Sequence, residues 1–323
     1  MVQCIVAFIL VCTLYYAGNN QGVNNTGYEW SNVTQAAEFP QGYNYPVFVF
    51  GDWMVTLNNG AWLSNDGHKW TKTDLSESGL NSAYQKYLQF DGAIYALGSL
   101  KGNYERFTVS TAIKRTRDFR RWETVEESSN LPQRIFYGAA VFDNKMWIIG
   151  GYDGKRYLND VWNSTDGVHW KQVAANTAWS PRTTTLTVFN ERLWILGGGT
   201  IDGEKNPNPN SYRELWSSPD GVTWTKVNAN FEKKWGGSPI VYDEKLWLVG
   251  MNRGAGFGSA VWVTNDGLNW EQHSAPWSPR GAVAAWVFRD KLFMTGGKSS
   301  YTENGEIKFV YSNDVWAMNK KTG

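Results

Sequence analysis

The chain has 323 residues, a formal net charge of +1, and nearly equal numbers of basic (31) and acidic (30) residues. Because these charges are interspersed, the composition gives no basic footprint for nucleic-acid binding. Both cysteines, Cys4 and Cys12, lie near the N-terminus, so the rest of the chain is predicted to contain neither disulfides nor thiol chemistry.

The first element is an uncharged, mostly apolar segment at residues 4–17. It is shorter than the ~20 residues of a membrane-spanning helix and is typical of the apolar core of a signal peptide. Tyr15 and Tyr16 stand where small residues usually precede cleavage, which leaves an uncleaved anchor as the alternative. We expect residues 1–24 to be a signal peptide or short anchor with a linker. The protein is then secreted, periplasmic or at the cell surface, and its mature chain has no membrane span.

A tryptophan hairpin recurs along the rest of the chain, with an Asp-Gly turn between two tryptophans. The clear copies are Trp62–Trp70, Trp162–Trp170, Trp216–Trp224 and Trp262–Trp270. A divergent copy runs from Lys114 to Trp122 and has Asp118-Phe119 in place of Asp-Gly. Successive closing tryptophans are 46 to 54 residues apart. Such a period indicates one supersecondary unit used repeatedly.

Each unit is predicted to contain four short strands. In the unit that closes at Trp170, residues 134–142 form the first strand, 146–151 the second and 160–162 the third. An Asp-Gly pair between apolar strands is a strong signal for a hairpin with a two-residue loop, because both loop residues need positive φ. A two-residue loop at Asp166-Gly167 would place Asn163 opposite Trp170.

These motifs resemble the kelch repeat. A Gly-Gly doublet such as Gly150-Gly151 ends one strand, an acidic-Val-Trp strand follows, and a Trp closes the unit. The same broad group includes the central domain of galactose oxidase. The resemblance covers residues 25–319 and implies an all-β propeller of four-stranded antiparallel blades. It is specific for architecture and weak for function, because this fold hosts unrelated activities.

The blade count follows from six predicted third strands, which centre on Trp62, Lys114, Trp162, Trp216, Trp262 and Trp316. The last of them, within Asn313–Met318, has no fourth strand after it, whereas Gly27–Val33 has the ending of a fourth strand and nothing before it. We therefore expect residues 25–323 to form one monomeric six-bladed propeller. The N-terminal strand completes the C-terminal blade, which leaves no free sheet edge.

Binding is expected on the face that carries the connections between second and third strands, because these connections vary in length. The predicted loops are 99–106, 152–158, 199–213, 251–259 and 298–309. Tyrosine and arginine commonly anchor interfaces. The candidate ligand-binding residues of these loops are Tyr152, Arg156, Tyr157, Tyr212, Arg213, Arg253 and Tyr301.

Three further arginines, Arg134, Arg182 and Arg280, recur at the entrance to the first strands. Guanidinium groups around a central channel would suit a carboxylate or an acidic peptide, so these arginines are also candidate ligand-binding residues. The alternative is that each pairs with the backbone or an acid of a neighbouring blade.

Acids precede the third-strand tryptophans in several repeats, at Asp160, Glu214 and Asp314. Because a catalytic residue is normally needed only once per chain, this repetition predicts hydrogen bonding within blades.

No catalytic set stands out. The three histidines, His68, His169 and His273, fall on predicted fourth strands at the outer rim, so neither the copper site of galactose oxidase nor another cofactor or metal is expected. The Asp-Gly turns look similar to the Asp-boxes of sialidases, with one residue fewer between Asp and Gly.

The kelch-like sialic acid mutarotase family is a closer architectural match than the sialidases. It would require one channel acid with one channel arginine. Glu303 and Glu306 are the acids to test against Arg134 and Arg280.

We favour a binding module that holds a protein or glycan ligand on its variable loops, with no catalytic residue assigned. The alternative is a carbohydrate-active enzyme, such as a sialic acid mutarotase or a glycosidase, that works at the mouth of the channel.

Overall fold

The computed structural model describes residues 27–74, 80, 85–102, 107–119, 121–200, 210–231, 237–250 and 257–321. The chain divides into two compact units, one formed by Trp30–Asn319 and one by Met1–Glu29 with Lys320–Gly323. In the second unit, the backbone N–H of Lys321 donates to the carbonyl of Gly27 at 2.8 Å. The expected signal peptide at 1–24 lies outside the described residues. Within the described ranges no helix long and apolar enough to cross a membrane is found.

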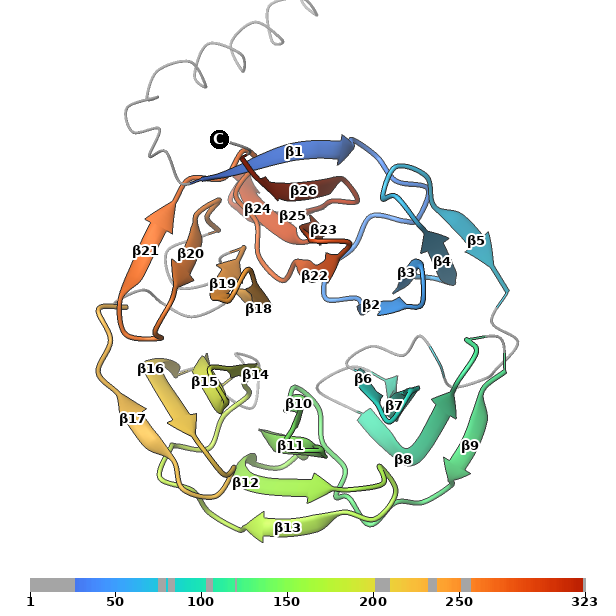
Figure 1. Ribbon diagram of the computed structural model, residues 1–323, viewed down its shortest axis with the longest axis vertical. Coiled ribbons are helices and arrows are strands. Elements are labelled where there is room, and N and C mark those ends of the chain that lie inside the picture. Colours follow the sequence, from blue (N-terminus) through green and yellow to red (C-terminus); the bar gives the residue numbers. More distant parts are fainter. Residues whose placement is uncertain are drawn as a thin grey trace, which may run out of the picture. The chain divides into compact units, whose positions relative to one another are not determined.

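The unit Trp30–Asn319 is a ring of small antiparallel sheets (Figure 1). Over the described residues, the strands form six four-stranded sheets and one two-stranded sheet. Five blades follow the chain order. Their strands are β2 (Val47–Phe50), β3 (Trp53–Leu57), β4 (Ala61–Ser64) and β5 (Thr71–Thr73); β6 (Lys86–Phe90), β7 (Ala93–Gly102), β8 (Phe107–Thr116) and β9 (Glu123–Glu126); β10 (Gly138–Phe142), β11 (Lys145–Tyr152), β12 (Tyr157–Ser164) and β13 (Lys171–Ala174); β14 (Leu186–Phe189), β15 (Arg192–Gly199), β16 (Ser211–Ser218) and β17 (Thr225–Val227); β18 (Ser238–Tyr242), β19 (Lys245–Val249), β20 (Val261–Thr264) and β21 (Trp270–His273).

The sixth blade joins the two ends of the chain, as the repeat count predicts. Its strands are β22 (Ala284–Phe288), β23 (Lys291–Thr295), β26 (Val315–Lys320) and β1 (Tyr28–Thr34), in the order β22-β23-β26-β1. The hydroxyl of Ser31 donates to the carbonyl of Ala317 at 3.4 Å, and the ring of Trp30 meets that of Trp277 edge-on at 4.7 Å. The prediction that the N-terminal strand completes the last blade is confirmed.

Apolar side chains cover both faces of each second strand, because each four-stranded sheet packs between two others. Met146, Trp147, Ile148 and Ile149 of β11 are all almost fully buried. Hydrophobic contacts therefore run from blade to blade, and one core cluster joins Trp147 and Ile149 to residues of β14, β15 and β16. This arrangement explains the unbroken apolar runs in the second strands.

The two-residue turn predicted at Asp166-Gly167 is found instead between the first and second strands of the same blade. Phe142 pairs with Lys145 across a two-residue loop, and both loop residues, Asp143 and Asn144, have positive φ (48° and 52°). The Asp166-Gly167 turn is wider, because Asn163 pairs with Lys171 and not with Trp170. The predicted register was wrong by one residue, because Asp166 is used as a hydrogen-bond acceptor within a longer loop.

The Gly-Gly doublet forms a bulge within the second strand. The pairing register shifts between Ile149 and Gly151, and the N–H of Gly151 donates to the carbonyl of Arg182, which belongs to the segment entering the next blade. A Cβ on Gly151 would lie 2.7 Å from the carbonyl oxygen of Ile135, so the doublet lets chain segments approach where a side chain would collide.

Several connections predicted as loops are extensions of the second and third strands. β7 and β11 reach Gly102 and Tyr152. Most of the predicted loop 298–309 is a separate hairpin formed by β24 (Lys298–Glu303) and β25 (Glu306–Tyr311). Its two-residue loop is Asn304-Gly305, with φ values of 52° and 81°. An Asn-Gly pair is a strong hairpin signal.

Candidate functional site

The recurring arginines form ion pairs inside their own blades. Arg134 is buried and donates from Nη1 and Nη2 to the two carboxylate oxygens of Asp160 at 2.7 and 2.9 Å. Its Nη1 also donates to the carbonyl of Gly150 and its Nε to that of Pro132. The indole N–H of Trp162 donates to Asp160 at 2.7 Å, so one acid holds an arginine and a tryptophan together.

The same arrangement recurs in two further blades. Arg182 donates to Glu214 at 2.9 Å and to the carbonyl of Gly197, and Arg280 donates to Asp314. Burial opposes ionisation of Glu214, but hydrogen bonds from Arg182 and Lys226 outweigh it and hold the pKa of this carboxyl below its ordinary value.

These contacts give the repeated arginines and acids a role in holding the blades together. The acids bond within blades as predicted, and the arginines match the alternative of the sequence analysis, except that each partner acid belongs to the same blade and not to a neighbour. Glu303 and Glu306 lie beside the Asn304-Gly305 loop of the hairpin, and no contact joins them to Arg134 or Arg280 in the described structure.

The remaining predicted residues that the structure describes lie on the face formed by the second-to-third strand connections and the linkers between blades, which we call the loop face. Tyr152 pairs with Tyr157 across β11 and β12, with ring centroids 4.9 Å apart. Arg156, on the exposed turn between them, lies 3.6 Å from Asp153. The guanidinium of Arg182 stands 3.9 Å over the ring of Tyr212.

Two further predicted residues remain apart from these contacts. Arg213 is exposed next to Tyr212, and Tyr301 is half exposed on β24. Arg253 lies outside the described residues. The structure therefore places the predicted residues on several blades and does not bring them together into one cluster.

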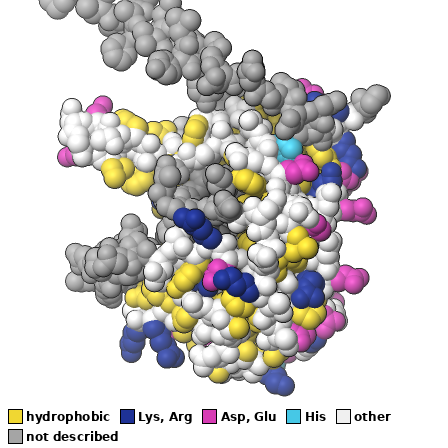
Figure 2. Space-filling model, turned by 90° about the vertical axis from the view of Figure 1, so that its left-hand side faces the viewer, with side chains coloured by type: hydrophobic (Ala, Val, Ile, Leu, Met, Phe, Trp, Pro, Cys, Tyr) yellow, Lys and Arg dark blue, Asp and Glu magenta, His cyan; other side chains and the backbone are white. Residues whose placement is uncertain are grey.

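Among the described residues, the exposed hydrophobic side chains of the loop face are concentrated on the β24–β25 hairpin. Ile307 and Phe309 of β25 are 66% and 51% exposed. Because alternate residues of a strand share a face, these two side chains and Tyr311 form one stripe. A narrow projection in Figure 2 carries hydrophobic side chains along its length and acidic ones near its end, which are the residue types of this hairpin.

An aromatic cluster supports the base of the hairpin. Tyr43, from the linker between β1 and β2, stacks on Tyr311 with ring centroids 5.5 Å apart and planes 17° from parallel. The ammonium of Lys298 lies 4.6 Å over the ring of Tyr43 and 5.2 Å over that of Phe309. Sequence reasoning missed this cluster because it joins segments from opposite ends of the chain. The alternation of Ile307, Phe309 and Tyr311 was the available signal.

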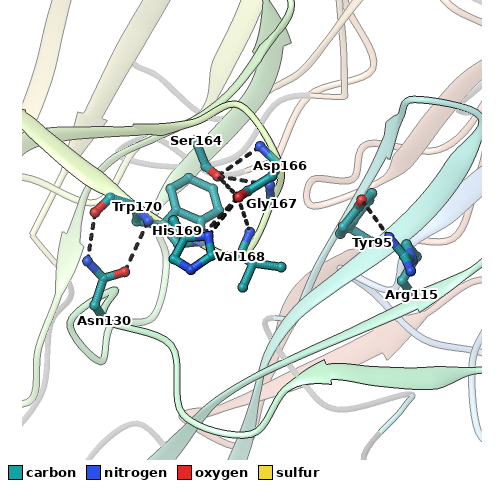
Figure 3. A network of polar contacts seen from close by, with 9 residues as sticks. All are labelled: Tyr95, Arg115, Asn130, Ser164, Asp166, Gly167, Val168, His169 and Trp170. Atoms are coloured by element: carbon teal, nitrogen blue, oxygen red, sulfur yellow. Dashed lines mark hydrogen bonds and ion pairs between the residues drawn. The ribbon is translucent and has the colours of Figure 1, made fainter.

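The opposite face, which we call the turn face, carries the Asp-Gly turns, and these are closed internal networks (Figure 3). Asp166 accepts from the N–H groups of Val168 and His169 at 2.8 Å and from the hydroxyl of Ser164 at 2.9 Å. Burial opposes its ionisation, but the hydrogen bonds from His169 and its neighbours hold the pKa of Asp166 well below its usual range. The same bonding recurs around Asp66, Asp220 and Asp266.

In three repeats the closing tryptophan is also tied to the linker that leads into its blade. The backbone N–H of Trp170 donates to the side chain of Asn130, which donates in turn to the carbonyl of Trp170, at 3.0 and 2.7 Å (Figure 3). Repeated and internally satisfied groups of this kind are structural. No group of three or more His, Cys, Asp or Glu side chains within the described ranges is placed to hold a metal ion.

Comparison with known proteins supports the architecture. The model of a family described as "DUF6242 beta propeller domain" matches residues 13–239. The structure described as "Structure of YjhT" superposes with a TM-score of 0.66 at 12% identity, covering 87% of this chain and all of that one. At this identity the likeness shows the fold alone.

Among curated proteins, the chain is 29% identical over 186 residues to the Kelch repeat protein M-T8 of Myxoma virus (strain Lausanne), which covers 53% of this chain and 33% of the viral protein. It is 25% identical over 175 residues to the human Leucine-zipper-like transcriptional regulator 1, which covers 49% of this chain and 19% of that protein. The chain thus matches a third or less of the length of these relatives.

Proposed function

We propose that this chain, which belongs to the family of DUF6242 beta propeller domains, is a binding propeller that recognises a partner protein on its loop face. The observation that carries this proposal is the distribution of exposed apolar groups. Six of the ten large hydrophobic residues that are exposed in the described structure belong to the hairpin and its support: Tyr43, Tyr301, Ile307, Phe309, Val310 and Tyr311.

The contrast between these apolar groups and the polar groups of the blades also supports this proposal. The arginines, their acids and the Asp-Gly carboxylates are occupied by bonds within the fold. The hairpin instead exposes apolar and aromatic side chains, which cost free energy in water and favour burial against a partner. Tyrosine and phenylalanine are among the residues enriched at interface cores.

Two matched double variants test the proposal. Tyr301→Ala with Phe309→Ala removes exposed apolar groups from the loop face, and Val222→Ala with Leu268→Ala removes similarly exposed groups from the turn face. Both are screened against a phage-displayed library of linear peptides and against a glycan array. We expect peptide binding that is lost in the loop-face variant and kept in the turn-face variant.

The opposite dependence, or recognition of glycans with no recognition of peptides, would overturn the proposal. Chemical conversion of a bound glycan, measured as hydrolysis or anomer exchange, would support the enzyme alternative instead.

We also propose that the protein is exported, on the strength of the apolar segment 4–17. The mass of the protein recovered outside the cytoplasm tests this. A mature chain shortened at its N-terminus by about two dozen residues is expected for cleavage of a signal peptide of common length. Recovery from the cytoplasm alone contradicts export.

A further inference from the structure

The β24–β25 hairpin has two open edges. It is a two-stranded sheet, and no other strand of the described chain extends it. Each edge of such a sheet presents a row of N–H and C=O groups that can pair with another strand. At the base of β24, Gly281 and Lys298 exchange hydrogen bonds of 3.0 and 2.9 Å. The next residue, Ala282, has φ of 55°, which turns that segment away.

The edge of β25 also pairs with a neighbouring segment only at its base. The N–H of Gly42 donates to the carbonyl of Ser312 at the base of β25, at 3.1 Å. Tyr43 then stacks on Tyr311, and Asn44 turns away with φ of 55°. The described part of the chain thus supplies only the first contacts of a third strand on each side, and it leaves the outer part of the hairpin unextended.

The register identifies the groups that face outward. Glu303 pairs with Glu306 across the two-residue loop, and from such a closing pair every second pair of an antiparallel ladder directs its N–H and C=O groups outward. On β25 these belong to Ile307 and Phe309. The outward bonding of Lys298 to Gly281 fits the same alternation.

The two edges differ in their side chains. Ile307 and Phe309, whose backbone groups face outward on β25, are apolar and exposed. The corresponding positions on β24 are Ser300 and Thr302. A strand added to β25 would bury apolar side chains against the exposed stripe, whereas one added to β24 would meet hydroxyl groups.

The tip of the hairpin is acidic. Glu306 lies 2.6 Å from the ammonium of Lys308. Glu303 is directly opposite Glu306, and among the described residues no cation pairs with it. Like charges on directly opposed residues disfavour the pair, so a cationic side chain from a partner would relieve this repulsion.

We propose that β25 takes up an extended segment of the partner protein as a third strand. The segment has apolar residues at every second position, which contact Ile307 and Phe309, and a lysine or arginine that reaches Glu303 and Glu306. This inference rests on the proposed protein-binding function and specifies its mode. Backbone pairing supplies affinity, and the alternating side chains supply selectivity.

A glycan fits the same hairpin less well. Sugar rings stack on open aromatic faces, but Lys298 covers one face of Tyr43 and one of Phe309, and Tyr43 and Tyr311 cover each other. The open hydrogen-bonding edge of β25 is suited to a peptide backbone.

Proline substitutions on the two edges test the inference with a matched control. Ile307→Pro removes an outward N–H of β25 while leaving the bonds between β24 and β25, and Ser300→Pro does the same on β24. The probe is a synthetic peptide chosen by phage display on the unaltered protein, and affinity is measured by fluorescence anisotropy. We expect Ile307→Pro to weaken binding by about tenfold or more, and Ser300→Pro to leave it nearly unchanged.

A second measurement removes the dependence on protein variants. Peptides that are N-methylated at one alternate set of residues lose the N–H groups that face β25, and peptides methylated at the other set keep them. Strand addition predicts that only one set abolishes binding to the unaltered protein. This result decides the question if Ile307→Pro lowers the melting temperature.

The outcomes separate the two proposals. If peptides bind, but neither proline variant matters and both methylated sets bind equally, strand addition is overturned while the binding function stands. If no peptide binds and glycans do, both proposals fall. Peptides enriched without alternating apolar residues and a basic residue also contradict the inference.

Discussion

At the scale of single residues, the second repeat lacks the Asp-Gly turn. A larger residue in its turn is matched by a smaller residue in the preceding blade. In the clear repeats the glycine of the Asp-Gly turn lies under a large side chain of the preceding blade. A Cβ on Gly221 would lie 2.1 Å from the ring of Trp147. In the second blade the turn position is Phe119, with φ of 61°, and the position equivalent to Trp147 in the preceding blade is Val55. Both are buried in one cluster.

This exchange of sizes predicts strong coupling between the two positions. Phe119→Gly alone should leave a cavity and destabilise the protein by about 3 kcal/mol, and Val55→Phe alone should overpack the cluster by about 1–3 kcal/mol. The double variant restores the arrangement of the other blades, so its loss should fall short of the sum by on the order of 1–3 kcal/mol. Urea unfolding of all four proteins measures this, and strictly additive losses would argue against a packing exchange.

At the scale of elements, the Asp-Gly turns are stabilised by ionised carboxylates. Backbone N–H of Asn269 contributes most to lowering the pKa of Asp266, to about 2, against the opposing effect of burial. Because the folded-state pKa lies below the unfolded value of about 3.9, the stabilisation is present above pH 4 and is lost as the pH falls towards 2. The pKa values of Asp66, Asp166 and Asp220 are lowered as well.

Asp266→Asn should therefore reduce stability at pH 7 and lessen its dependence on pH. Its free energy of unfolding, measured by urea titration at several pH values, should approach that of the unaltered protein as the pH falls from 4 to 2. Asp52→Asn is the control, because the ion pair of Asp52 with Arg289, at 3.6 Å, lies at the surface, where such pairs contribute little to stability. A constant difference between Asp266→Asn and the parent at every pH would contradict the role of the charge.

The elements also show which parts of the fold could be predicted from the sequence. The tryptophan spacing predicted the blades because each tryptophan is needed at the same place in every unit. The β24–β25 hairpin is not part of the repeat, so the repeat pattern assigned residues 298–309 to a loop, although Asn304-Gly305 is a hairpin signal. Whether Arg134 points to the channel or to Asp160 depends on strand register, and the sequence does not specify which way that side chain points.

At the scale of the whole propeller, the arrangement depends on β1. The strand supplies the fourth position of the sixth blade, and the hydroxyl of Thr34 donates to the carbonyl of Gly67 in the first blade at 3.1 Å. It therefore contacts both sides of the closure. Its loss would expose the edge of β26 and remove the packing of Trp30 on Trp277.

Deletion of Tyr28–Thr34 should lower the melting temperature by on the order of 10 °C, since it removes both the packing of the half-buried Trp30 on Trp277 and the pairing of a whole strand with β26. Calorimetry measures the change. A synthetic peptide of residues 27–37 added to the deleted protein should restore part of it, because the site on β26 is still present. A deleted protein that melts like its parent would show that closure does not depend on this strand.

Closure by β1 also sets an order of events during synthesis. Ser31 and Ala317 are 286 positions apart, so the ribosome must release the whole segment from β1 to β26 before these two strands can pair. Until then the nascent protein carries an unpaired β1 and an incomplete ring. A product that terminates before β26 has no strand with which β1 can pair, and such products are expected to be degraded before they accumulate.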